Sequence, residues 1–202
     1  MRHSPSSYKG ERAALRLTAA TAVVMLLMSG CSSDQISPPP TTSPTTTTTA
    51  SPTTSAVAPV GMRLPTLDLV STVEPVGTDD RVLQIPPKPW VVGWWKDGAR
   101  PGGSDGTVVL TAHLDSRKYG VGPFEQAKQL RPGDPMSLSD SDGRTHRYTV
   151  KRVDTFTKQA LPYEDLFRQS GPERVVFVTC GGNYDRNNGG WDSNVVITFA
   201  TT

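Results

Sequence analysis

Short stretches of β-branched and other apolar residues recur from residue 60 to the end of the chain, and Gly-, Pro- and Asp-containing turns separate them. Such runs between turn signals are typical of β-strands. The predicted strands are residues 107–111, 135–139, 148–153, 175–179 and 195–199. Only residues 122–130 and 163–170 suggest short helices. The pattern predicts a mainly antiparallel β-sandwich or a closed β-barrel.

The N-terminal segment has a different pattern. Lys9, Arg12 and Arg16 precede an apolar run of 12 residues, 17–28. A membrane-spanning helix needs about 20 apolar residues, so this run is short for a span and fits the central region of a secretory signal. An uncleaved signal anchor is the alternative. Both interpretations place the rest of the chain outside the cytoplasmic membrane.

The apolar run ends in Met28-Ser29-Gly30-Cys31, which resembles the lipobox of bacterial lipoproteins. That resemblance implies that residues 1–31 are a signal peptide and that Cys31 carries the lipid anchor. Residues 32–59 are rich in Thr, Pro and Ser and hold few apolar side chains, which predicts a disordered tether. Residues 60–202 are then the folded domain, held at the outer face of the membrane and reaching into the cell wall.

The charge distribution excludes nucleic acid as a partner. Four of the 21 Lys and Arg residues and two of the 19 Asp and Glu residues precede residue 60, which leaves 17 of each sign in the folded domain. A neutral domain has no basic stripe to bind phosphates.

Two cysteines are present, in segments of different kinds. If Cys31 is acylated, Cys180 is an unpaired thiol in an oxidising compartment, which calls for an explanation. A small buried core residue is one interpretation. The other is a nucleophile, because Cys180 directly follows the predicted strand 175–179 and precedes Gly181 and Gly182, where a bulky acyl group has access.

The domain holds two histidines. His113 follows the apolar strand 107–111, whereas His146 lies among charged residues and is expected at a solvated edge. A cysteine nucleophile needs a thiolate, which a neighbouring imidazole supplies or stabilises, so Cys180 and His113 are the candidate pair. Closed zinc sites take four ligands, and these residues are too few for one. No metal or cofactor is expected.

Several motifs together resemble the bacterial sortases. Residues 111–116 read TAHLDS, residues 122–124 GPF, residues 130–134 LRPGD and residues 178–182 VTCGG, and residues 89–103 are most similar to the class F and E sortases of actinobacteria. The resemblance covers the whole domain. It implies a mainly all-β fold, a closed eight-stranded sortase-type barrel with short helices in its connections.

The resemblance also implies a function. Sortases cleave an LPXTG-like sorting signal between Thr and Gly through a thioacyl-enzyme, and an amine such as that of a peptidoglycan precursor resolves the intermediate. Cys180 corresponds to the nucleophile and His113 to the general base and acid. By the same resemblance, Thr179, Leu161 and Pro162 are expected to contact the sorting signal.

The third sortase residue, an arginine on the final strand, has no counterpart in residues 190–194. Arg186 is the only arginine after Cys180 and is the candidate oxyanion donor, with a solvent-exposed loop charge beside Asp185 as the alternative. The missing arginine leaves open a non-catalytic wall-binding lipoprotein with a sortase-like barrel. A Cys/His wall endopeptidase is also open, although in such enzymes the cysteine precedes the histidine.

Overall fold

The computed structural model describes residues 56–186 and 189–202. The predicted signal peptide, the lipidation site Cys31 and most of the predicted tether lie outside the described residues. None of the helices in the described part of the chain has the length and apolar character needed to cross a bilayer.

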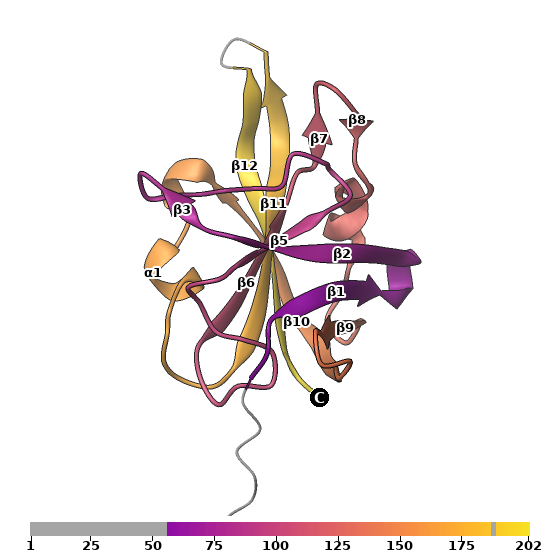
Figure 1. Cartoon of the computed structure of the whole chain (residues 1–202). Helices are drawn as coiled ribbons and strands as arrows, with labels where there is room; N and C mark the ends of the chain where they lie inside the picture. Colours follow the sequence, from indigo (N-terminus) through magenta and orange to yellow (C-terminus); the bar gives the residue numbers. More distant parts are fainter. Residues whose placement is uncertain (1–55, 187–188) are drawn as a thin grey trace, which may run out of the picture. The chain divides into compact units, whose positions relative to one another are not determined.

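The described residues form a closed barrel of eight strands, as the resemblance predicts (Figure 1). Around the barrel the order is β1-β2-β5-β6-β11-β12-β10-β9. The barrel strands are β1 (Pro59–Leu64), β2 (Leu69–Val76), β5 (Val92–Trp95), β6 (Thr107–Ala112), β9 (Pro135–Asp140), β10 (Thr145–Thr157), β11 (Arg174–Asp185) and β12 (Gly190–Thr201). Neighbouring strands are antiparallel except for the pairs β2–β5 and β6–β11, which are parallel.

Within residues 56–186 and 189–202, two short hairpins and four short helices fill the connections. The hairpins are β3 (Thr78–Asp79) with β4 (Val82–Leu83), and β7 (Asp115–Ser116) with β8 (Gly120–Val121). The helices are η1 (Pro65–Leu67), η2 (Pro123–Gln129), η3 (Lys158–Ala160) and α1 (Tyr163–Leu166).

The predicted helix at residues 122–130 is present as the 3₁₀ helix η2, but the one predicted at 163–170 ends at Leu166. The next residues instead form side-chain contacts, because Arg168 donates to the carbonyls of Ser170 and Pro172. Gly171, with φ of +79°, and Pro172 then turn the chain into β11.

Strand β11 is apolar on both faces, which explains its unbroken run of valine and phenylalanine. Val175 and Phe177 point into the barrel core, whereas Val176 points outward. On the outside, Val176 packs with Val196 of β12 and with Leu166 of α1. Full burial of such side chains contributes about 1.5–3 kcal/mol each, so the segment that carries α1 is held to the outer face of the sheet.

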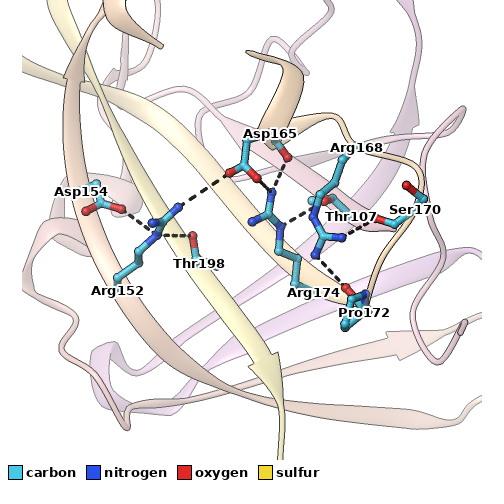
Figure 2. A network of polar contacts seen from close by, with 9 residues as sticks. All are labelled: Thr107, Arg152, Asp154, Asp165, Arg168, Ser170, Pro172, Arg174 and Thr198. Carbon is cyan, nitrogen blue, oxygen red and sulfur yellow. Dashed lines mark hydrogen bonds and ion pairs between the residues drawn. The ribbon is translucent and has the colours of Figure 1, made fainter. Parts of the chain in front are cut away.

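Arginines hold the same segment by polar contacts (Figure 2). Arg174, at the start of β11, donates to Thr107 Oγ1 at 3.1 Å and pairs with Asp165 Oδ1 at 3.1 Å. Arg152 of β10 pairs with Asp154 at 3.0 Å and lies 3.8 Å from the other oxygen of Asp165. Asp165 of α1 therefore joins the helix to two barrel strands.

Candidate active site

Cys180 and His113 lie at the same edge of the barrel because their strands are parallel. The pairing of β11 with β6 matches Val178 with Thr111 and Thr179 with Ala112. The pairing and β6 end there, and Cys180 and His113 are the next residues along the two segments, at the same end of the two strands. Side chains alternate along a strand, so Cys180 points outward like Val176 and away from the barrel core.

Cys180 lines a cavity of about 900 Å³ on the outside of the barrel. One wall is the β3–β4 hairpin with its flanking residues, and the other is the segment from Leu161 to α1 and Phe167. Figure 1 shows β3 and α1 on the same side of the barrel. The lining residues are Thr78, Arg81, Val82, Leu83, Ile85, Trp95, Thr111, Ala112, Leu161, Tyr163, Glu164, Leu166, Phe167, Val178, Thr179, Cys180 and Asn194.

Asn194 is the direct cross-strand neighbour of Cys180 and lines the same cavity. Directly opposed residues on antiparallel strands share a face, with their Cβ atoms about 4.5–5.5 Å apart. The Asn194 amide is therefore within reach of an acyl group on the Cys180 sulfur. Sequence reasoning missed this residue, because only the pairing register of β11 with β12 shows which residue faces the cysteine.

His113 is half-buried and lines a second, smaller cavity of about 270 Å³. This cavity lies between the β7–β8 hairpin and the ribbon in which β11 and β12 pair beyond the barrel, and Asp115, Tyr184 and Trp191 line it as well. Trp191 Nε1 donates to Asp115 Oδ1 at 2.9 Å and stacks edge-on with Tyr184. These contacts join the ribbon to the strand that follows His113.

The environment of Cys180 favours the neutral thiol. Burial raises the pKa of the Cys180 thiol, the positive charge of Lys158 opposes this rise, and the negative charge of Asp115 adds to it. Within the described residues no hydrogen bond joins the thiol to the His113 ring. A thiol of this kind reacts only after a base removes its proton.

The backbone changes direction directly after Cys180. The β11–β12 register shifts between Gly181 and Tyr184, a β-bulge, and Gly182 has a φ of +79°. Asp192 accepts hydrogen bonds from the Ser193 hydroxyl and from the Asn183 backbone N–H, which lower the pKa of the Asp192 carboxyl. A Cβ atom on Gly182 would overlap Asp192 Oδ1, so the bulge requires glycine at this position.

The other predicted site residues differ in position. Thr179 and Leu161 line the larger cavity, whereas Pro162 precedes α1 and does not line it. The Thr179 hydroxyl is buried and has no hydrogen-bond partner within the described residues.

Arg186 is exposed just after the last residue of β11 and lines neither cavity. Arg186 lies six positions after Cys180, at most about 20 Å away along the strand.

His146 is not the solvated edge residue that its charged neighbours predict. Its Nε2 lies 2.9 Å from Oδ2 of Asp140, and its side chain is only 18% exposed. The ring packs against Gly102, where an added Cβ would come within 2.6 Å of it. Asp140 is buried, and this tertiary pairing outweighs the local charge pattern.

Among the described residues, no group of three or more His, Cys, Asp or Glu side chains is placed to hold a metal ion.

A family model and solved structures of similar fold both relate this chain to known proteins. The family model of the sortase domain matches residues 62–201. Sortase C-1 from Actinomyces oris is 23% identical over 70% of this chain and 72% of its own, with a TM-score of 0.53. A lid mutant of sortase A from Corynebacterium diphtheriae is 18% identical over 74% and 73%, with a TM-score of 0.54. Sortase C from Clostridium perfringens SM101 is 17% identical over 70% and 68%, with a TM-score of 0.51. A comparison with curated proteins finds no match.

Proposed function

The chain belongs to the sortase family of cysteine transpeptidases, and we propose that it cleaves an LPXTG-like sorting signal and transfers the acyl group to a cell-wall amine. This proposal is supported by the positions of Cys180 and His113, which follow the paired residues Thr179 and Ala112 of two adjacent parallel strands, with Cys180 lining the larger cavity and His113 the smaller one. An extended peptide lying in the cavity would bring its scissile amide to the Cys180 sulfur.

In the proposed reaction His113 takes the proton of the Cys180 thiol, and the sulfur attacks the Thr carbonyl carbon of the signal. The Thr–Gly amide bond breaks, a thioester forms on Cys180, and His113 returns the proton to the leaving Gly amine. An acceptor amine then attacks the thioester, loses a proton to His113 and releases the thiol. Burial raises the pKa of the Cys180 thiol and so favours its neutral form, and in this scheme proton transfer to His113 accompanies the attack.

The developing oxyanion needs a donor. Asn194 is our structural candidate, because it faces Cys180 across the β11–β12 ladder and lines its cavity. Arg186 stays the sequence-based candidate, although it lies at the far end of the ribbon. Loss of an oxyanion donor costs about 10²–10³ in kcat, so Asn194→Ala and Arg186→Ala, assayed side by side, separate the two candidates.

We also propose that Thr179, Leu161 and Pro162 contact the sorting signal. The chain is proposed to be of class F or E, a lipoprotein anchored through Cys31 to the outer face of the membrane. Residues 1–31 would be its signal peptide, 32–59 its tether and 60–202 its catalytic domain. Release of the Cys31→Ser protein from cell membranes, compared with the unaltered protein, tests the anchor.

The proposed reaction is tested by incubating residues 56–202, which include the whole barrel, with an LPXTG-type peptide and an amine acceptor. The expected result is amide exchange that disappears in Cys180→Ala and in His113→Ala. Hydrolysis of cell wall without exchange would indicate the endopeptidase instead. Peptide or wall binding without turnover would indicate the non-catalytic barrel.

A further inference from the structure

The β3–β4 hairpin places an arginine over the cavity that contains Cys180. Thr78 pairs with Leu83 and Asp79 with Val82, so the two turn residues are Asp80 and Arg81. Their φ angles are +48° and +65°. Positive φ at both central residues is the requirement of a type I′ turn.

Arginine is an unfavourable residue for this turn. Type I′ turns strongly prefer Asn-Gly or Asp-Gly, because an L side chain at the second central position is crowded by its own backbone. Asp80 fits the first position, whereas Arg81 occupies the position at which glycine is preferred. Side chains held in such sparsely populated conformations cluster at functional sites, so the side chain of Arg81 calls for a role.

The surroundings of Arg81 indicate what that role is. Of the cavity-lining residues that the structure describes, Arg81 is the only Lys or Arg and Glu164 the only Asp or Glu. They lie on opposite walls, Arg81 on the hairpin and Glu164 on α1, and apolar side chains form most of the surface between them. No carboxylate in the described part of the chain forms an ion pair with Arg81.

We propose that Arg81 is a specificity-determining residue that binds an acidic side chain of the peptide in this cavity. A guanidinium at the edge of an apolar cleft attracts a carboxylate, and Glu164 repels one from the opposite wall. Together the two charges orient the peptide, with its acidic side chain toward the β3–β4 hairpin. The inference rests on the proposed function only in taking a sorting-signal peptide as the ligand.

Peptide binding to the Cys180→Ala protein tests the inference without chemistry. The probes are fluorescent LPXTG-type peptides with Glu, Gln or Lys at X or at either of the two residues before Leu, and the readout is fluorescence anisotropy. For at least one position, Glu is expected to bind about 2- to 5-fold more tightly than Gln, the range for a solvent-accessible ion pair, and Lys more weakly than Gln. In the Arg81→Gly background the preference should disappear, and in Arg81→Glu it should reverse.

The glycine substitution separates binding from folding. Because Gly suits the type I′ turn, Arg81→Gly should melt at the same temperature as the parent or higher, so lost selectivity cannot come from a damaged hairpin. Arg63→Gln removes an exposed arginine from β1, outside the cavity, and should keep the preference for Glu.

Equal affinity for the Glu, Gln and Lys peptides at every position, no measurable binding of the Glu peptides, or a preference that persists in Arg81→Gly would overturn the inference. Amide exchange by the protein with Cys180 intact is measured separately. Selectivity that depends on Arg81 without exchange would reject the transpeptidase and keep the binding role. Exchange without such selectivity would reject the role of Arg81 alone.

Discussion

At the scale of single residues, the charges around Cys180 decide how easily its thiol ionises. Burial raises the thiol pKa, and Lys158 and Asp115 shift it in opposite directions. Lys158→Gln removes the stabilising positive charge and should raise the pKa further, whereas Asp115→Asn should lower it. The rate of iodoacetamide alkylation as a function of pH measures both shifts. If the unaltered protein, Lys158→Gln and Asp115→Asn give the same alkylation rate at every pH, then neither Lys158 nor Asp115 affects the thiol pKa.

Sequence reasoning could propose Cys180 and His113, because each follows an apolar strand and belongs to a recognisable motif. It could not find Asn194 or Arg81. Asn194 faces the cysteine only through the register of two strands, and Arg81 enters the cavity only because a tight turn brings the hairpin to the outer face. Residues of this kind are defined by pairing and turn geometry, for which the sequence has no separate signal.

At the scale of elements, the bulge after Cys180 depends on Gly182. An alanine there combines a φ of +79° with overlap against Asp192, whereas Gly143, with a φ of +81°, has open space around it. Gly143→Ala should lower the free energy of unfolding by about 1 kcal/mol, the cost of the left-handed conformation. Gly182→Ala should cost about 1–3 kcal/mol more because of overpacking, measured by urea unfolding. Equal losses of unfolding free energy in Gly182→Ala and Gly143→Ala would mean that the Asp192 side chain moves away from the new methyl group without a penalty.

The α1 segment depends on Asp165, which pairs with Arg174, a side chain only 14% exposed. Asp165→Asn should lower the free energy of unfolding by about 1 kcal/mol and should raise KM for the peptide more than it lowers kcat, because α1 forms a wall of the cavity. The control is Asp142→Asn, whose pair with Arg144 is about half exposed on both sides and should contribute less than about 0.5 kcal/mol. An unchanged KM in Asp165→Asn would show that the ion pair does not hold the wall in place.

The element boundaries show where the sequence pattern ends. Strands 175–179 and 195–199 were predictable, but β11 continues to Asp185 and β12 begins at Gly190. The added residues are mostly polar or glycine, and the outermost of them, Tyr184 with Trp191 and Asp185 with Gly190, pair beyond the barrel, where there is no core to impose an apolar alternation. The aromatic pair Tyr184–Trp191 is one of the contacts that support this ribbon, with the hydrogen bonds from Trp191 to Asp115 and from Asn183 to Asp192.

At the scale of the whole molecule, the barrel could be predicted from the combined motifs, whereas its two parallel pairings could not. Those pairings join strands that are distant in sequence, and the parallel pair β6–β11 is the one that puts His113 and Cys180 at the same end of neighbouring strands. Hydrophobic pattern alone left a sandwich and a barrel equally open. The site is therefore a product of topology more than of any local segment.

Acid stability of the domain should depend on Asp140. Its hydrogen bond with His146, together with the backbone N–H groups of Arg144 and Asp142, lowers the Asp140 pKa in the folded state. The stabilisation is complete above the unfolded-state pKa, ordinarily about 3.9, and is lost as the pH falls through the lower folded pKa. Urea unfolding at pH values from 2 to 7 should show this loss of unfolding free energy. In Asp140→Asn the unfolding free energy should fall less steeply at acid pH. If the unfolding free energy of Asp140→Asn falls equally steeply at acid pH, the acid sensitivity belongs to other carboxylates.

The central claim is that Cys180 carries the acyl group of a cleaved peptide. Intact-mass spectrometry after acid quench, with an LPXTG-type peptide and no amine acceptor, tests it most directly. The predicted result is a hydroxylamine-sensitive adduct equal in mass to the peptide's N-terminal acyl fragment, located on Cys180 and absent from Cys180→Ala. Cleavage of the peptide with no adduct on Cys180, or an adduct that persists in Cys180→Ala, would contradict the account.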